Sequence, residues 1–183
     1  MALLPLARLQ CALAGVAWGK GWLFYGLPIL QRHRASTMHF GAHLTLRSLA
    51  ASNPLAPNHP VVLTTREAGA ALSIGDHVGI TGGAVVCAQR VSIGSRVMIG
   101  ANSILCDTDF HPLDAAVRRE RPLDAATAPV VIEDDVFIGM GCLILKGVTI
   151  GRGSVIGAGS VVTRDVPAGV IAAGSPARVI RAL

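Results

Sequence analysis

His111 is the residue best suited to chemistry, in the segment Asp107-Thr108-Asp109-Phe110-His111-Pro112. An imidazole exchanges a proton near neutral pH, so a positioned histidine can act as general base toward a hydroxyl group. Pro112 restricts the preceding backbone to extended geometry, which helps to fix the direction of the ring. Asp107 or Asp109 could accept a hydrogen bond from the second ring nitrogen. A histidine among acids is also common in surface loops, so the function depends on where the fold places it.

The chain on either side of this segment repeats every six residues. Residues 130–163 put apolar side chains in one register, at Ile132, Ile138, Ile144, Ile150, Ile156 and Val162. A helix of 3.6 residues per turn cannot keep this register on one face, whereas six extended residues form one side of a three-sided coil. The positions four residues after these anchors are small or β-branched, as a narrow interior requires: Val136, Cys142, Val148, Ser154 and Ser160. The pattern predicts an all-β solenoid with coils stacked at strand spacing.

The repeat is interrupted twice. It begins weakly at Phe40-Gly41, breaks at the loop Ser52–Pro60, resumes at Ile74-Gly75 and stops after Leu105. Residues 107–129 have no six-residue register, and insertions of this length in compact domains are usually functional. We expect a helical cap over residues 1–35 and a solenoid over residues 36–183, with the insertion leaving one corner and reaching a neighbouring subunit.

The first thirty residues are apolar but interrupted by Arg8 and Lys20, which leaves no run long enough to span a membrane. The order of charge and apolar residues does not match a signal peptide, so we expect a cytoplasmic protein. We predict one amphipathic helix over residues 3–23 that covers the open edges of the first coil. The alternative is a peripheral membrane anchor with Trp18, Trp22 and the flanking bases at the interface.

Composition limits the classes of function. The 183 residues suit one domain, and the four cysteines (Cys11, Cys87, Cys106 and Cys142) have no metal-ligand spacing, so we expect buried, reduced thiols. Residues 1–66 carry six bases and no acid, residues 67–145 five bases and ten acids, and residues 146–183 five bases and one acid. Basic ends suit the phosphates of a cofactor or of lipid headgroups, while no nucleic-acid-binding motif is present.

The repeat from about residue 40 to residue 181 resembles that of the hexapeptide-repeat acyltransferases, which form left-handed parallel β-helices. The segment 107–112 resembles a motif of the sugar and xenobiotic O-acetyltransferase branch, which includes the maltose, galactoside and nodulation-type acetyltransferases. Residues 169–178, with the sequence GVIAAGSPAR, resemble the closing signature of the family. The resemblance implies a homotrimer that transfers acetyl from acetyl-CoA directly to a hydroxyl of a saccharide or related small acceptor, with His111 as general base and no acyl-enzyme.

The resemblance also implies binding residues. By position in the matching motifs, the candidate CoA contacts are Met140, Ala158, Thr163, Arg164, Arg178 and Arg181. Some relatives bind the acceptor with an asparagine where this chain has Thr81-Gly82, so Thr81 and Asn102 are the candidate acceptor contacts, and the acceptor itself stays open.

Three other functions compete with this one. The acceptor could be serine or a xenobiotic. A carbonic-anhydrase-like lyase uses the same solenoid with three zinc-binding histidines, for which His39, His43, His77 and His111 are available. Their spacing lacks the close pair that such a site needs, so we expect no metal. The third alternative is a scaffold without catalytic activity.

Overall fold

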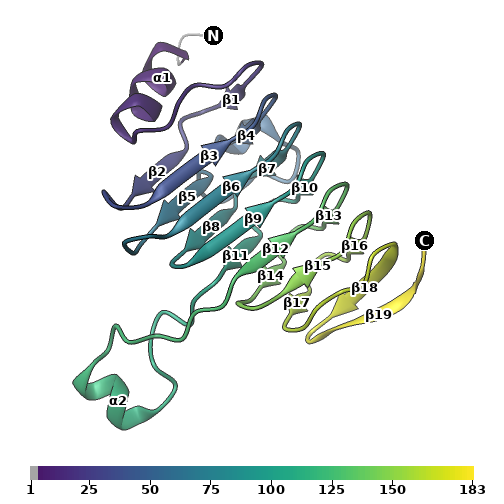
Figure 1. The fold of residues 1–183 in the computed structure, drawn as a ribbon. Helices are drawn as coiled ribbons and strands as arrows, with labels where there is room; N and C mark the ends of the chain where they lie inside the picture. Colours follow the sequence, from purple (N-terminus) through teal and green to yellow (C-terminus); the bar gives the residue numbers. More distant parts are fainter. Residues whose placement is uncertain (1–3) are drawn as a thin grey trace.

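The computed structural model describes residues 4–183 and has the form of a three-sided stack of coils, with a helix across its first end and an arm at its side (Figure 1). The chain visits three sheets in turn, and strands one coil apart pair in parallel. The predicted all-β fold, a left-handed parallel β-helix with an N-terminal helix and a long insertion, is confirmed. No helix among the described residues is long and apolar enough to cross a membrane.

We name the sheets A, B and C in the order in which the chain meets them. Within residues 4–183, sheet A holds β1 (Leu23–Tyr25), β4 (Thr45–Arg47), β7 (Gly79–Thr81), β10 (Met98–Ile99), β13 (Phe137–Ile138), β16 (Val155–Ile156), β18 (Val170–Gly174) and β19 (Ala177–Ala182). Sheet B holds β2 (Ile29–Arg32), β5 (Val62–Thr65), β8 (Ala84–Cys87), β11 (Ile104–Cys106), β14 (Leu143–Ile144) and β17 (Val161–Val162). Sheet C holds β3 (Thr37–Phe40), β6 (Ala71–Ile74), β9 (Arg90–Ile93), β12 (Val130–Ile132) and β15 (Thr149–Ile150). The last pair, β18 and β19, is antiparallel.

Turns join the sheets at three edges of the prism. The A/B edge consists of the turns at residues 82–83, 100–103, 139–142 and 157–160. The B/C edge consists of the turns at residues 33–36, 66–70, 88–89 and 145–148, and it carries the insertion at residues 107–129. The C/A edge consists of the turns at residues 41–44, 75–78, 94–97, 133–136 and 151–154. A loop at residues 48–61 with a short 3-10 helix, η1 (Ala50–Ser52), lies between β4 and β5.

The core is the predicted column of aliphatic side chains. The anchors from Ile132 to Val162 are at most 1% exposed, and the small residues four positions later are equally buried. At some turns neighbouring coils approach so closely that only glycine fits after the anchor. A Cβ added at Gly139 would lie 2.6 Å from the backbone nitrogen of Ala158. The six-residue period therefore fixed both the register and the coil spacing.

The first helix is shorter than predicted. Helix α1 (Leu4–Leu13) is terminated by the turn at Gly15, whose φ of +66° only glycine adopts easily. Val16 donates its N–H to the carbonyl of Cys11 at 2.8 Å. The first coil then begins at β1, so strands β1 and β2 lie inside the segment that we had assigned to the cap. Both the predicted helix end at residue 23 and the domain boundary at residue 35 are too late.

The two tryptophans belong to the core of the first coil. Trp22 is buried and donates its indole N–H to the carbonyl of Gly41 at 2.6 Å. Trp18 is half-buried, with its ring centroid 5.0 Å from that of Trp22. The suggestion that these two residues sit at a membrane interface is therefore wrong, because their rings fill the end of the prism.

Candidate functional site

The insertion is fastened to the prism at its first residue. Asp107 is fully buried, and its carboxylate accepts hydrogen bonds from the backbone N–H groups of Ala88 at 2.6 Å and of Gln89 and Arg90 at 2.7 Å. These three donors form the preceding turn of the B/C edge. Asp107 therefore holds the insertion to the coil below, and our hypothesis that it orients the His111 ring is wrong.

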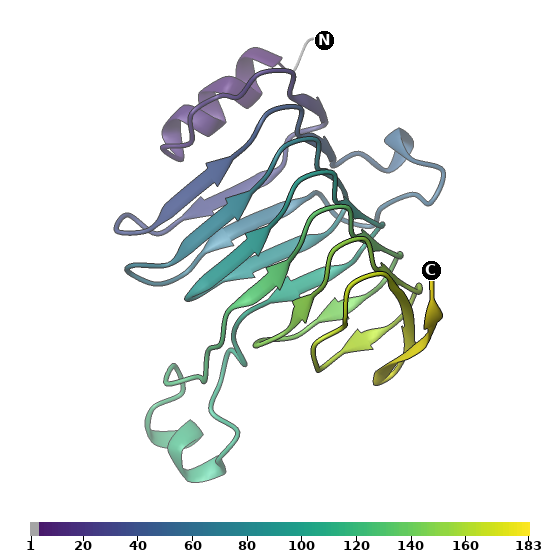
Figure 2. The same ribbon diagram turned by 45° about the vertical axis from the view of Figure 1, so that its right-hand side comes forward.

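The next residues form a two-stranded neck. Thr108 and Thr127 face each other in an antiparallel bridge, and the N–H of Asp109 donates to the carbonyl of Ala126 at 3.0 Å. The Asp109 carboxylate pairs with Lys146 of the following coil at 3.2 Å. Asp109 is thus engaged by the prism and not by the imidazole. The neck carries a short helix, α2 (Ala115–Glu120), away from the body of the prism (Figure 2).

The ring of His111 is oriented by the backbone of the arm. Its Nδ1 lies 2.8 Å from the carbonyl oxygen of Pro122. A carbonyl oxygen can only accept, so Nδ1 must carry the hydrogen, and neutral His111 then keeps its lone pair on Nε2. His111 is exposed, at the start of an arm that Asp114 closes into α2 by capping its first turn. The arrangement presents a proton acceptor to a molecule outside this chain's own prism.

Four candidate binding residues form a single column on the A/B edge. Thr81, Asn102, Met140 and Ala158 lie at the turns of four successive coils, and backbone hydrogen bonds of 2.8 to 3.1 Å join each turn to the next. Asn102 occupies the place of Gly141 and Gly159, one residue after the place of Met140 and Ala158. Arg178 in β19 pairs with Ala173 in β18, and the side chain of Ala173 packs over Gly157, the residue before Ala158. Arg178 therefore extends the column. The edge therefore combines a row of turns with a cation at one end.

This edge is open enough to take an extended ligand. A Cβ added at Gly141 or at Gly159 would meet no atom within 4 Å, and Ala158 offers only a methyl group. Met140 is 40% exposed. A thin flexible chain could lie along these turns with its phosphates near Arg178, which is what a CoA molecule requires.

The remaining candidates lie elsewhere. Thr163 and Arg164 follow β17 on the B/C edge, on the same side as the insertion, and both are exposed. Arg181 pairs with Ile171 in the antiparallel β18–β19 pair, at the C-terminal edge of sheet A. One chain therefore divides the predicted residues between two edges that are separated by the width of sheet B.

The acceptor candidates lie next to a loop that the sequence did not connect with them. The side chain of Asn102 accepts a hydrogen bond from the N–H of Asn58 at 3.0 Å, and a Cβ added at Gly82 would lie 2.1 Å from Cβ of Pro57. The loop at residues 48–61 therefore covers the A/B edge beside Thr81. The signal available in the sequence was the cluster of polar residues between its prolines.

The cysteines do not suggest nucleophilic catalysis. Burial raises the pKa of Cys11 to about 11, and burial together with the Asp107 carboxylate raises the pKa of Cys87 to about 12. Burial also raises the pKa of Cys106 and of Cys142, so all four thiols stay protonated at neutral pH and are poor nucleophiles.

The candidate zinc ligands are dispersed. His43 and His77 stack with ring centroids 4.5 Å apart on the C/A edge, whereas His111 stands on the arm and His39 lies on sheet C. Within residues 4–183, no group of three or more His, Cys, Asp or Glu side chains is placed to hold a metal ion. The four histidines thus lie on three different parts of the described chain.

Known proteins share both the repeat and the fold. A family model described as bacterial transferase hexapeptide (six repeats) matches residues 129–164, and one described as the hexapeptide repeat of succinyl-transferase matches residues 90–106. A Schizosaccharomyces pombe protein named as an acetyltransferase is 50% identical over 91 residues, which are 50% of this chain and 42% of that protein. The 2,3,4,5-tetrahydropyridine-2,6-dicarboxylate N-acetyltransferase of Staphylococcus aureus is 38% identical over 88 residues, which are 48% of this chain and 31% of that protein.

Among solved structures, a galactoside acetyltransferase in complex with coenzyme A superposes with a TM-score of 0.57 at 28% identity, covering 90% of this chain and 64% of that one. The chain spans less than half the length of the curated relatives that it matches. In its repeat and its β-helix, the chain is similar to the hexapeptide-repeat acetyltransferases.

Proposed function

We propose that this protein transfers an acetyl group from acetyl-CoA to a hydroxyl group of a saccharide or related small acceptor, with His111 as general base. The observation that carries the proposal is the His111 ring, which is held through Nδ1 by the Pro122 carbonyl and keeps Nε2 available. A galactoside acetyltransferase with coenzyme A bound is among the similar structures and supports the same donor. Thiol release from acetyl-CoA, measured against a panel of sugars, tests the proposal.

The chemistry assigned to this chain's residues is proton transfer and positioning. Acetyl-CoA supplies an activated acyl carbon in a thioester. Nε2 of His111 accepts the proton of the acceptor hydroxyl as the new C–O bond forms, and it returns that proton to the sulfur when the C–S bond breaks. The Pro122 carbonyl stabilises the imidazolium that exists between these two events, because it accepts from Nδ1 in both protonation states.

A complete site needs a second copy of the chain. The arm with His111 leaves the B/C edge, while the open column with Met140, Ala158 and Arg178 follows the A/B edge. The outward side chains of sheet B, which lies between these edges, form an apolar stripe: Ile29, Val62, Ala84, Ile104, Leu143 and Val161. The matching stripe on sheet C is mostly polar: His39, Ser73, Ser92, Val131 and Thr149. A neighbour packed on sheet B would bring one copy's arm to the other's column.

We therefore expect a homotrimer, with a mass by light scattering of three times the 18.9 kDa of one chain. Leu143→Arg places a charge in the middle of the stripe on sheet B and should yield monomers with little activity. Val131→Arg makes the same kind of change at an outward position of sheet C and should leave the trimer intact. A monomeric wild-type protein with full activity would contradict the shared site.

Arg178 and Arg181 are expected to contact the phosphates of CoA. Replacing both with alanine should raise the KM for acetyl-CoA severalfold with little change in kcat, because the contact exists in the ground state and the transition state alike. The effect should be larger at low salt. Arg90→Ala/Arg152→Ala removes one exposed arginine from sheet C and one from the C/A edge, and it is the control. Equal wild-type kinetics with acetyl-CoA and its dephospho analogue would argue against a contact to the 3′-phosphate.

An amine acceptor is the second candidate, since the S. aureus relative is named an N-acetyltransferase. A pair of acceptors that differ only in one hydroxyl or amino group separates the two functions. We expect the hydroxyl form to be acetylated with the higher kcat/KM.

A further inference from the structure

Helix α1 presents its large side chains to the outside. The residues that it buries are small, Ala7 and Cys11, one turn apart on one face. Leu6, Leu9 and Leu13 recur on the opposite face, and they are 51%, 55% and 80% exposed. A helix that served only to cap the prism would bury its leucines and expose its small residues. The observed orientation leaves an apolar ridge along the outer side of the cap.

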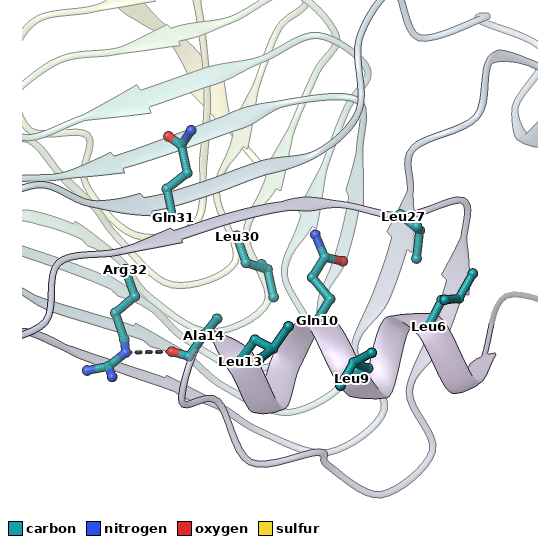
Figure 3. A pocket seen from close by; sticks show the side chains of 9 residues that line it. All are labelled: Leu6, Leu9, Gln10, Leu13, Ala14, Leu27, Leu30, Gln31 and Arg32. Carbon is teal, nitrogen blue, oxygen red and sulfur yellow. Dashed lines mark hydrogen bonds between the residues drawn. The ribbon is translucent and has the colours of Figure 1, made fainter.

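The ridge continues onto the first coil. A cleft of about 590 Å³ lies between the helix and β2, and Figure 3 shows Leu6, Leu9 and Leu13 along the helix with Leu27 and Leu30 across from them. On the other side of the helix, a second cleft of about 540 Å³ is lined in part by Leu4, Leu23, Tyr25 and Leu49, all exposed. Apolar side chains therefore line the clefts on both sides of the helix at this end of the prism.

The charges around this end have a single sign. The first acidic residue of the chain is Glu67, whereas residues 1–66 contain six bases. Arg8, Lys20 and Arg34 are exposed, and Arg32 donates to the carbonyl of Ala14 beside the first cleft. An apolar surface surrounded by bases, with no acids, complements a partner that offers an apolar interior beneath an anionic outer layer.

We propose that the N-terminal end of this protein docks on the surface of an anionic lipid bilayer, with Leu6, Leu9 and Leu13 entering the boundary between headgroups and acyl chains. The bases then lie at the level of the lipid phosphates. We favour a bilayer as the partner because residues 1–66 carry six bases and no acid, which matches a surface of uniformly anionic headgroups. The inference is independent of the acetyl transfer proposed above.

Cosedimentation of the full chain with phosphatidylcholine vesicles, with and without phosphatidylglycerol, tests the proposal. We expect binding that requires the anionic lipid and falls about tenfold when salt is raised. Leu6→Gln/Leu9→Gln/Leu13→Gln should lower the affinity at least tenfold and leave the circular dichroism spectrum unchanged, because these side chains are already exposed. Ile180→Gln/Leu183→Gln removes exposed apolar residues from the C-terminal β19 segment and should bind like the wild type.

Three results would overturn the docking. The first is that the wild type does not sediment with anionic vesicles. The second is that the triple variant binds as tightly as the wild type. In the third, the triple variant has a smaller assembly mass than the wild type without lipid, which would assign the leucines to a contact between copies of the chain.

Discussion

Replacing His111 with alanine should lower kcat by roughly 10²–10⁴-fold, the usual contribution of a positioned general base. Acetyl-CoA should still bind, since the A/B edge that would hold it does not involve the arm of the same chain. The pH dependence of kcat/KM should differ between the two proteins, because only the wild type has an imidazole that exchanges a proton with the acceptor hydroxyl. Steady-state kinetics across pH, with acetyl-CoA binding by calorimetry, make both measurements.

His111→Asn is the sharper variant. Its amide N–H can still donate to the Pro122 carbonyl and keep the arm closed, yet the side chain has no basic nitrogen. It should be as inactive as the alanine variant. His39→Ala removes an exposed imidazole from sheet C and should retain wild-type rates. If His111→Asn kept most of the activity, the role of His111 would be to shape the arm, and the base would lie elsewhere.

Replacing Asp107 with alanine should destabilise the fold by roughly 3–5 kcal/mol, because three backbone N–H groups would lose a buried, charged acceptor. For a chain of this size, each kcal/mol lowers Tm by about 2–4 °C. Thermal and urea unfolding at fixed protein concentration measure the loss. Asp107→Asn should fall between the alanine variant and the wild type, since one oxygen can still accept while the amide group cannot.

Asp109→Ala is the matched control. Its pair with Lys146 is partly exposed, so the loss should stay below about 1 kcal/mol. Since neither aspartate bonds the imidazole, we expect Asp109→Ala to leave kcat within a few-fold of the wild type. An Asp107→Ala protein as stable as the Asp109→Ala protein would mean that the turn at residues 88–90 finds other acceptors.

The sequence predicted the coils well where side chains repeat and poorly where they do not. From Ile74 onward, β-branched anchors recur in register, and six of them are followed directly by glycine: Ile74, Ile93, Ile99, Ile138, Ile150 and Ile156. The first coils use Trp22, Leu44 and Leu46 in the same interior places. Because these residues differ in type from the Ile and Val of the later coils, they hide the period. Gly15 was the available signal for the end of α1, since a glycine in left-handed geometry ends a helix.

The candidate site could also be predicted only in part, and here the reason is not an irregular repeat. The segment around His111 identified the residue, but its orienting partner is a main-chain carbonyl eleven residues away. A carbonyl has no signature in a sequence, because every residue has one. The nearby aspartates were predicted as partners of the ring because of their charge, but Asp107 accepts hydrogen bonds from backbone N–H groups instead. The exposure of Leu6, Leu9 and Leu13 likewise depends on which face of α1 meets the prism.

The neck of the insertion allows the arm to change in length and composition without a change in the register of the coils. The chain leaves the prism at Cys106 and returns at Val130, and these residues belong to the consecutive strands β11 and β12 of one coil. The distance that the inserted segment has to close is thus set by the coil, whatever its length, and doubling the length of a flexible loop costs only about 0.6 kcal/mol. Arms of different length and composition can be exchanged at this corner while the register of every coil is kept. Acceptor preference can therefore diverge among descendants of such a chain while the stack beneath it stays the same.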